Sequence, residues 1–335
     1  MLIVVLRDRL APDAPADEAD NLIQARAVAQ ALNLLGHRVR DLECGLDLGR
    51  VAAALAAEPP DAVFNLVEAL DGRDTLAPAV PALLDSLGLP HTGSGALPLA
   101  AAADKLRAKR LLRRLGLPTP DWFERADLAD PAAAPSGPFL LKPRLEHGSV
   151  GIEESDLLPA PDRAALDRAL AAKEDALDQP CIAEAYLPGR EFNVAVLDGP
   201  CGPEVLPPAE MLFTGYGPDK PKVLGWRAKW DEASFEHGHT ERTFDLPPAD
   251  APLAERLRAL ALACFQALDM TGYARVDFRL DHLGAPQVID LNPNPCIAPD
   301  AGFPAAAARA GLSYRDMIAR VLAAALPARS PETVP

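Results

Sequence analysis

Two apolar segments near the carboxyl end of the chain, YARVDFRL and QVIDLN, carry acids where buried strands usually carry aliphatic residues. The intervening Asp-His-Leu-Gly is a turn sequence, so we expect the two segments to pair as adjacent strands. Successive strand residues point to opposite faces, so Val288, Asp290 and Asn292 are expected to share one face. A ligand must occupy that face, or its polar groups must lie in solvent.

Asp277 in the first segment would lie beside Asp290 and Asn292, which brings three oxygen donors together. Hard oxygen donors in small number suit Mg²⁺, which keeps water molecules and takes its remaining ligands from substrate phosphates. A cluster of solvated acids on an edge strand explains the same spacing. The six histidines form no pair at ligand spacing, so we do not expect a transition-metal site.

The bulk composition limits the classes of protein to consider. A chain of 335 residues is longer than one hydrophobic core usually supports, so two or three packed units are expected. Its 33 basic and 48 acidic side chains give a formal charge of −15, which argues against nucleic-acid partners and anionic membranes. Five cysteines without CxxC spacing argue against a disulfide framework, and the opening run LIVVL is too short for a signal peptide or membrane span. We therefore expect a cytoplasmic protein.

The first 95 residues are expected to form an open parallel sheet with helices on its faces. Strand-like segments occupy residues 2–6, 37–44 and 61–67, and the stretch between the first two has helical periodicity closed by Gly36. A second helix is expected around 76–87.

The rest of the chain favours antiparallel strands with intervening helices. In order, we expect a basic helix at about 98–115, a surface loop at 126–138, a strand at 139–144, strands within 181–199 and 204–211, a helix around 250–268 and a helical C-terminal segment before a frayed tail. The basic side chains of the first of these helices are interpreted as a solvated face; they stand at positions 105, 109, 110, 113 and 114.

Lys142 ends its strand just before a turn that contains Gly148 and Gly151. Backbone N–H groups and a cation in such a turn can hold a phosphate chain, and the turn itself is expected to be a mobile flap. The sequence lacks GxxxxGK[ST], and it lacks GxGxxG after the first strand, so neither a P-loop nor a dinucleotide-binding fold is expected. Another nucleotide-binding architecture is needed.

Eight pieces of the sequence occur in the order typical of one superfamily: LGLPHTGSG, DKLRAKRLLRRLGLPTP, FLLKPRLEHGSVGI, IAEAYLPGREFNVAVL, RAKW, YARVDFRL, VIDLNPNP and AGFPAAAARAGLSYRDMI. The chain resembles ATP-grasp ligases over most of its length and is most similar to the D-alanine–D-alanine ligase group. The resemblance implies an α/β and α+β architecture in which two lobes with antiparallel sheets grip ATP. The implied units are an N-terminal domain at 1–95, a central lobe at 96–186, a C-terminal lobe at 187–327 and a tail at 328–335.

The same resemblance assigns nucleotide contacts by position in these motifs. It places Lys105 and Lys142 at the phosphates, Glu184 at the adenine amino group with Ala185 and Leu187 beside it, and Glu191 at the ribose hydroxyls. Without the family context, Lys105 reads as an exposed helix charge and the two glutamates as solvated side chains.

Three residues are implied to take part in the chemistry. Lys229 of RAKW matches a lysine at the phosphate end of the site, and Arg275 matches an arginine that stabilises the transferred phosphoryl group and the tetrahedral intermediate. Ser149 in the flap is a third candidate catalytic residue. Arg275 can also simply pair with Asp277, and both roles can hold together because an arginine fork can bridge a carboxylate and an oxyanion.

The resemblance also supplies a reaction. Asp277, Asp290 and Asn292 match the ligands of two Mg²⁺ ions, with Mn²⁺ as an alternative. A substrate carboxylate would attack the γ-phosphoryl group of ATP to form an acylphosphate, and an amine would then attack the carbonyl carbon. The flap at 146–151 is expected to close over this intermediate and to exclude water.

The implied substrate pocket departs from D-alanine–D-alanine ligases, which argues against a cell-wall dipeptide as the product. Gly148 and Trp230 replace a flap serine and a tyrosine, Ala301 aligns with the serine that receives the second D-alanine's carboxylate, and Glu18 and Asp20 are the only stand-ins for an N-terminal glutamate. At the metal site, Asp290 stands where glutamate is usual.

Other residues are candidates for substrate contact. Glu68 ends a strand, where open sheets present ligand contacts, and it either grips a substrate ammonium group or caps the following turn. His147, Trp230 and Asp300 are further candidates. Cys296 is interpreted as a small buried apolar residue rather than as a nucleophile.

The predicted function is therefore that of an ATP-dependent carboxylate–amine ligase, which forms a peptide-like bond from amino acids or small peptides. Two alternatives stay open: a D-alanine–D-alanine ligase proper, and a non-catalytic ATP-binding regulator. The expected partners are small-molecule substrates, without nucleic acid or membrane. The resembled family is often dimeric, but no feature of this sequence decides between a monomer and a homodimer.

Overall fold

The computed structural model of the chain describes residues 1–10, 16–199 and 201–326. A parallel sheet with strand order β2-β1-β3 forms the N-terminal part, from β1 (Leu2–Asp8), β2 (Arg38–Cys44) and β3 (Ala62–Asn65). Helix α1 (Ala16–Leu34) connects the first two strands, as the periodicity predicts, and α2 (Leu48–Ala57), which the sequence did not indicate, connects the second and third. The predicted helix at 76–87 is a short η1 turn (Asp74–Leu76) followed by α3 (Ala79–Ser86).

The middle of the chain forms a four-stranded antiparallel sheet with strand order β4-β7-β5-β6. Its strands are β4 (Trp122–Phe123), β5 (Phe139–Pro143), β6 (Leu157–Leu158) and β7 (Cys181–Ala185). The short α6 (Arg125–Leu128), α7 (Arg163–Leu177) and the η2 turn (Glu154–Asp156) complete this lobe. Leu166 and Leu170 of α7 are fully buried against the sheet, which fixes the helix on one face and leaves the other face open to the rest of the chain.

The third sheet is the largest and runs in the order β11-β10-β8-β12-β13, with β9 paired to β8. Its strands are β8 (Glu191–Gly199), β9 (Gly202–Val205), β10 (Ala209–Phe213), β11 (Thr240–Thr243), β12 (Tyr273–Leu280) and β13 (Pro286–Asn292). One face packs against α10 (Ala251–Ala267), which follows the η3 turn (Pro248–Asp250). Between β10 and β11 the chain forms α8 (Trp226–Trp230) and α9 (Phe235–Gly238).

The prediction of a single helix at 98–115 is wrong, because the structure has two helices there, α4 (Ala96–Ala102) and α5 (Lys105–Arg114). Asp104 interrupts it. Its carboxylate accepts hydrogen bonds from the N–H groups of Leu106 and Arg107, at 3.0 and 3.2 Å, and so caps α5. Lys105 is therefore the first residue of α5. Its N–H donates a hydrogen bond to the carbonyl of Arg144, just beyond β5.

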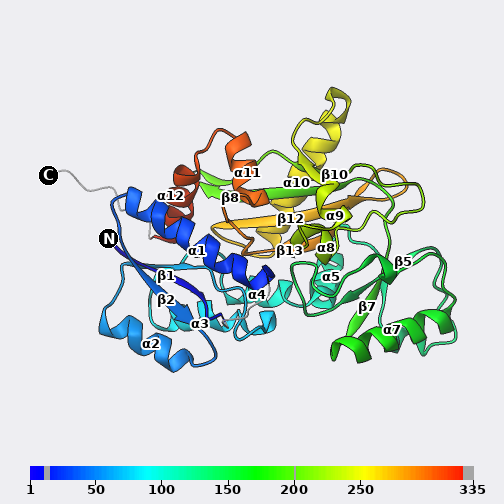
Figure 1. Cartoon of the computed structure of the whole chain (residues 1–335), viewed down its shortest axis with the longest axis horizontal. Coiled ribbons are helices and arrows are strands. Elements are labelled where there is room, and N and C mark those ends of the chain that lie inside the picture. The colour runs from blue at the N-terminus through cyan, green and yellow to red at the C-terminus, as the bar shows by residue number, and fades with distance from the viewer. Residues whose placement is uncertain (11–15, 200, 327–335) are drawn as a thin grey trace.

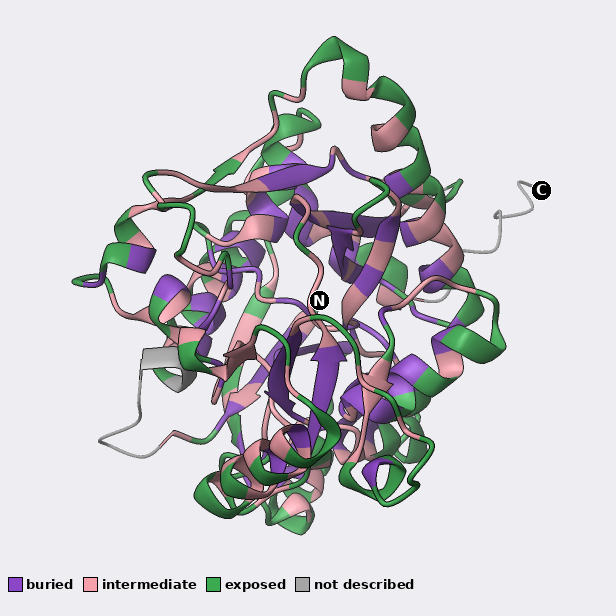
Figure 2. Ribbon diagram, turned by 90° about the vertical axis from the view of Figure 1, so that its right-hand side faces the viewer, coloured by how far each residue is buried: buried purple, intermediate pink, exposed green. Residues whose placement is uncertain are grey.

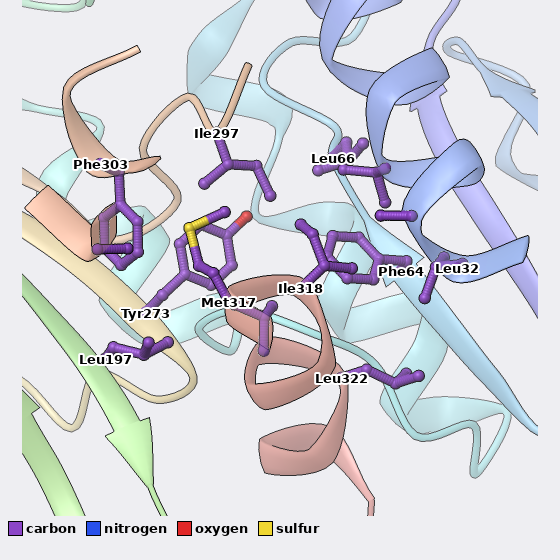
Figure 3. Close-up of a cluster of buried hydrophobic side chains, with 14 of the residues drawn as sticks. Leu32, Phe64, Leu66, Leu197, Tyr273, Ile297, Phe303, Met317, Ile318 and Leu322 are labelled. Atoms are coloured by element: carbon purple, nitrogen blue, oxygen red, sulfur yellow. The ribbon is translucent and has the colours of Figure 1, made fainter. Parts of the chain in front are cut away.

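The C-terminal helices, α11 (Gly302–Arg309) and α12 (Tyr314–Ala325), return to the N-terminal part of the chain. In Figure 3, Met317 and Ile318 of α12 lie between Leu197 and Tyr273 of the largest sheet and Phe64 of β3. These side chains are almost completely buried. The first and last segments therefore share one hydrophobic core, which holds the N-terminal sheet against the C-terminal one.

The three sheets follow one another along the chain in the order of the three predicted units, with α7 and its sheet at one end of the molecule and α2 at the other (Figure 1). Buried residues concentrate in the central strands and exposed residues on the outer helices (Figure 2). No helix in the described ranges is both long enough and apolar enough to span a membrane.

Candidate active site

A polar cavity lies between the four-stranded sheet and the largest sheet. The four-stranded side contributes Lys142 and Glu184, α5 contributes Lys105, and the flap contributes Ser149. The largest sheet and the segments around it contribute Leu187, Glu191, Lys229, Asp277, Arg279 and Asp290. Residues predicted from separate motifs thus line one cavity. Ala185 is not among its lining residues; its N–H donates to the carbonyl of Asp121 at 2.8 Å.

Two lysines predicted to bind phosphate converge because the start of α5 is bound to the end of β5. Lys105 and Lys142, each counted as a whole residue, are both 8% exposed to solvent. The ammonium group of Lys105 donates to the carbonyl of Glu146 in the flap. Burial lowers the pKa of Lys105, while the charge of Asp290 opposes that change.

Glu184 is held by two lysines rather than solvated. Its carboxylate lies 2.5 Å from the Nζ of Lys142 and 2.6 Å from the Nζ of Lys109. Burial raises the pKa of Glu184, but the two ammonium groups outweigh it and the pKa falls below its usual value. Lys109 also donates to the hydroxyl of Thr119 at 3.0 Å. The sequence interpretation missed this role, although Lys109 stands one helical turn after Lys105 and so shares its face.

Glu191 is likewise paired on the wall of the cavity. The Nη1 of Arg279 lies 3.3 Å from its carboxylate, and Nη2 donates to the hydroxyl of Tyr186 at 3.0 Å. Burial raises the pKa of Glu191, although the positive charge of Arg279 opposes this change. Arg279 was not predicted to be a site residue, yet it follows Arg275 and Asp277 at alternate positions of β12, which is the pattern of one strand face.

The acidic face of the largest sheet arises at an irregularity in strand pairing. Asp277 of β12 lies opposite Asp290 of β13, and Phe278 lies opposite Val288, so Ile289 is the extra residue of a β-bulge. Val288 packs in the core with Phe278 while Asp290 lines the cavity. The expectation that Val288 and Asp290 share a face is therefore wrong, because the bulge reverses the alternation between them.

Arg275 and the polar residues around it hold Asp277 in place. Its guanidinium donates through Nε and Nη2 to the two carboxylate oxygens, at 2.8 and 2.9 Å. The amides of Asn193 and Asn292 donate to the same carboxylate, at 2.8 and 3.2 Å. Burial lowers the pKa of Arg275, but Asp277 outweighs burial and raises it overall. Because the amide nitrogen of Asn292 faces Asp277, its carbonyl oxygen stays available to a cation.

Asp290 faces positive charge. Burial raises its pKa, but Lys105, His147 and Lys142 together bring the pKa below its usual value, so the carboxylate is ionised at neutral pH. Two carboxylates directly opposite each other repel unless cations lie between them. The donor set of Asp277, Asp290 and Asn292 therefore fits Mg²⁺, which needs one or two carboxylates beside phosphate oxygens and water.

A metal ion can also be held by a cluster of protein side chains alone. Across residues 1–10, 16–199 and 201–326, no group of three or more His, Cys, Asp or Glu side chains has the spacing to hold a metal ion. A cation on this face would thus need oxygen ligands from a phosphate chain, which couples metal binding to nucleotide binding.

The flap connects three parts of the chain. The hydroxyl of Ser149, a predicted catalytic residue, donates to the carbonyl of Leu224 at 2.7 Å, and the indole of Trp230 donates to the carbonyl of Gly148 at 3.0 Å. The N–H of His147 donates to Asp74 of the N-terminal part at 3.1 Å. Ser149 adopts a left-handed backbone conformation with φ of 67°, rare for a residue with a side chain. These contacts cover the cavity in a closed arrangement.

Comparison with known proteins identifies the family of this chain. Residues 111–323 match the protein family described as D-ala D-ala ligase C-terminus. A D-alanine–D-alanine ligase from Caulobacter sp. is 33% identical over 309 residues, which covers 90% of this chain and 88% of the relative. An uncharacterized protein, y4sG of Sinorhizobium fredii, is 33% identical over 311 residues and covers 89% and 86%, respectively. The chain belongs to the D-alanine–D-alanine ligase family.

The predicted ATP-grasp fold is confirmed by a solved structure. The D-alanine–D-alanine ligase from Bacillus anthracis, complexed with ATP, superposes with a TM-score of 0.71 over 97% of each chain, at 22% identity. Membership of the D-alanine–D-alanine ligase family makes this chain an ATP-dependent ligase that joins a carboxylate to an amine. The roles assigned to single residues stay predictions.

The candidate residues nearest the N-terminal sheet are held by side-chain hydrogen bonds. Gln24 donates to the carboxylate of Glu68 at 2.9 Å, and the thiol of Cys296 donates to Asp20 at 3.0 Å. Burial raises the pKa of Cys296, which argues against a nucleophile, but the residue is only partly buried and is hydrogen-bonded, so it is not the buried apolar residue of the sequence interpretation. Glu18, the other predicted stand-in, has a side chain outside the described residues. Asp300 is exposed at the start of the segment before α11.

Glu68 is an exposed residue, but its carboxylate packs beside the side chain of Gln24. The resulting loss of hydration, reinforced by the charge of Asp20 and opposed by the Gln24 hydrogen bond, raises the pKa of Glu68 to about 7. The carboxylate that the sequence named as a candidate ammonium ligand thus changes charge near neutral pH.

Proposed function

We propose that this member of the D-alanine–D-alanine ligase family joins the carboxylate of one amino acid or small peptide to the amine of another, through an acylphosphate formed from ATP with Mg²⁺. One observation carries the proposal: the ammonium groups of Lys105, Lys142 and Lys229 line the same cavity as the opposed carboxylates Asp277 and Asp290. Cations for a phosphate chain and oxygen ligands for a metal thus line one cavity.

In the first step, the substrate carboxylate attacks the γ-phosphoryl group of ATP, and ADP leaves. Lys105 and Lys142 from one lobe and Lys229 from the other distribute the negative charge that develops on the transferred phosphoryl oxygens. Mg²⁺ held by Asp277, Asp290 and Asn292 would supply further positive charge at the phosphates. Glu184 and Glu191 hold the adenosine end of the nucleotide against Leu187.

In the second step, the amine of the acceptor attacks the carbonyl carbon of the acylphosphate, and phosphate leaves. Arg275 stabilises the oxyanion while it stays bound to Asp277, because its guanidinium has donors for both. The amine loses a proton as the bond forms, and an oxygen of the departing phosphate can accept it. The flap closes over the intermediate through Gly148 and Ser149 and keeps water from hydrolysing it.

The substrate pair differs from two free D-alanines in this proposal. The relatives named D-alanine–D-alanine ligase support an amino acid or peptide as substrate. At the acceptor end, however, Ala301 offers no side-chain hydroxyl, and Trp230 uses its indole to bind the flap. On the donor side, Glu68 and Asp20 place two acids where one substrate ammonium group can bind.

A phosphate-release screen tests the proposal. Purified protein with ATP and Mg²⁺ is offered single compounds and pairs from a panel of L- and D-amino acids and dipeptides, and products are identified by mass spectrometry. Release that requires a carboxylate and an amine, with a condensed product, supports the ligase. Nucleotide binding without substrate-dependent release from any pair would contradict it and favour an ATP-binding regulator. Release with D-alanine alone would identify the D-alanine–D-alanine ligase proper.

The pKa of Glu68 predicts a pH dependence. A carboxylate with a pKa of about 7 is neutral at pH 6 and ionised at pH 8, so kcat/KM for the substrate whose ammonium it binds should rise about tenfold between these values. In Glu68→Gln this rise should disappear. Glu58→Gln is the matched control, since Glu58 lies in the same part of the chain and pairs with Arg38 and Arg40. An unchanged rise in Glu68→Gln would contradict the assignment.

A further inference from the structure

Three charged residues share one face of the largest sheet because they stand at alternate positions of β12. They are Arg275, Asp277 and Arg279. Asp277 is the proposed metal ligand, and Arg275 lies to one side of it along the strand. Arg279 lies to the other side, about 7 Å from Asp277 by the rise of two residues. It stands directly opposite Glu191 of β8, and both side chains line the cavity.

This order along β12 matches the order of groups in a bound nucleotide. The phosphates lie at Asp277 if the metal is bound there, and the reacting carbonyl group lies beyond them, at Arg275. The sugar is on the other side of the phosphates from the reacting group, so it reaches Glu191 and Arg279. A carboxylate repels phosphate oxygens but accepts hydrogen bonds from hydroxyl groups, and ribose presents two adjacent hydroxyls.

The guanidinium of Arg279 is fixed by three hydrogen bonds. Nε donates to the carbonyl of Gly189 at 3.2 Å, Nη1 to the carboxylate of Glu191 at 3.3 Å, and Nη2 to the hydroxyl of Tyr186 at 3.0 Å. Its Cζ also lies 4.7 Å from the centroid of the Tyr186 ring. The side chains of Arg279 and Glu191 are only 6% and 5% exposed. Arg279 therefore holds one position against Glu191.

This ion pair leaves the carboxylate of Glu191 able to accept further hydrogen bonds. In the described part of the chain, Nη1 of Arg279 is the single donor to this carboxylate, and it binds Oε2. A buried carboxylate without a cation takes up a proton more readily and then becomes partly a donor. The guanidinium keeps Glu191 ionised, so Oε1 and the remaining lone pair of Oε2 can accept from two hydroxyl groups.

We propose that Arg279 positions the carboxylate of Glu191 to accept both ribose hydroxyls, so that the site selects ribonucleotides over 2′-deoxyribonucleotides. The inference rests on the nucleotide site of the proposed function and adds to it a selectivity for the sugar. Arg279 is then a positioning residue, because it acts on the nucleotide through Glu191.

The test compares the binding of ADP and of 2′-deoxyADP, each with Mg²⁺, by isothermal titration calorimetry. Neither nucleotide has a γ-phosphoryl group to transfer, so the measurement does not depend on knowing the substrates of the ligase. The wild type should bind ADP about 10- to 100-fold more tightly than 2′-deoxyADP, and Arg279→Met should reduce this ratio about tenfold. Arg279→Lys keeps a positive charge near Glu191 and should retain part of the ratio.

A double-mutant cycle shows whether Arg279 acts through Glu191. Glu191→Gln should lower the ratio by itself, and adding Arg279→Met to that variant should lower it no further. The double variant also has no unpaired buried carboxylate, so it controls for the loss of stability expected in Arg279→Met.

Arg320→Met is the matched control. Arg320 also pairs with a glutamate of the largest sheet, Glu204 of β9, at 2.8 Å, but it is not among the residues that line the cavity. The ratio of the two dissociation constants should be that of the wild type. Thermal melts of all variants identify any that do not fold.

The inference is overturned if the wild type binds both nucleotides equally, or if folded Arg279→Met keeps the wild-type ratio. An equal loss of affinity for both nucleotides also overturns it, because the guanidinium then contributes charge without selecting the sugar. These results are independent of the phosphate-release screen. A wild type that prefers ADP but releases no phosphate with any substrate pair refutes the ligase and leaves the sugar selectivity standing, whereas a wild type that binds neither nucleotide removes both.

Discussion

Replacing Lys142 by alanine is expected to lower acylphosphate formation about 100- to 1000-fold, the effect of removing one preorganised charge from a phosphoryl-transfer site. Lys142 lines the cavity and is buried, so no solvent cation can easily take its place. Its partner Glu184 keeps the ammonium group of Lys109 at 2.6 Å, which spares the variant an unpaired buried carboxylate. Trapping with hydroxylamine, after mixing with ATP and donor, measures the intermediate directly.

Lys173→Ala is the matched control for Lys142→Ala. Lys173 belongs to the same lobe, its side chain is 11% exposed against 10% for Lys142, and it forms a 2.6 Å ion pair with Asp156 away from the cavity. It should trap as much hydroxamate as the wild type. A thermal melt of both variants separates loss of folding from loss of chemistry. Undiminished trapping in a folded Lys142→Ala protein would exclude Lys142 from phosphoryl transfer.

The behaviour of the basic helix shows how far local sequence can predict a site. The pattern of α5 indicated a solvated cationic face, and this is correct for Arg110 and Arg113, which are largely exposed. It is wrong for Lys105 and Lys109, which lie inside the molecule. Only the contact of α5 with β5 and β7 distinguishes the two groups, and a contact between distant segments leaves no periodic signal.

The acidic face illustrates a second limit. The motif predicted that Asp277, Asp290 and Asn292 would meet, and strand pairing does bring them together. The β-bulge at Ile289 decides on which face of the strand Asp290 lies, and no turn residue or glycine in the sequence indicates that bulge. If the strand alternated regularly from Val288, Asp290 would share the core-facing side of Val288, where an ionised carboxylate is costly.

Long-range packing was the least predictable part of the fold. The parallel strands, the antiparallel lobes and most helices follow from hydrophobic periodicity and from Gly and Pro punctuation. That α12 completes the core of the N-terminal sheet does not, because its apolar stripe fits any apolar surface. Similarly, Arg279 and Lys109 become site residues only once their carboxylate partners are placed beside them.

Replacing Asp290 by asparagine is expected to raise the Mg²⁺ concentration for half-maximal phosphate release about tenfold or more, because the site loses one of its two carboxylates. Without metal, the variant should bind a nucleotide as tightly as the wild type or more tightly. The reason is that Asp290 of the wild type offsets the positive charges of Lys105 and Lys142. Mg²⁺ titrations, and Mn²⁺ binding followed by electron paramagnetic resonance with a non-hydrolysable ATP analogue, measure the two effects separately.

These opposite signs distinguish a metal ligand from a residue that only shapes the cavity. A general loss of structure at Asp290 would weaken nucleotide and metal binding together, whereas loss of a ligand weakens the metal alone. Asp290→Glu keeps the charge on a longer side chain and should retain most of the Mg²⁺ response. Asp245→Asn removes an exposed acid that pairs with Arg309, and it should not change that response. If the Mg²⁺ titration of Asp290→Asn superposes on that of the wild type, Asp290 is not a ligand, and Asp277 with Asn292 must hold the cation without it.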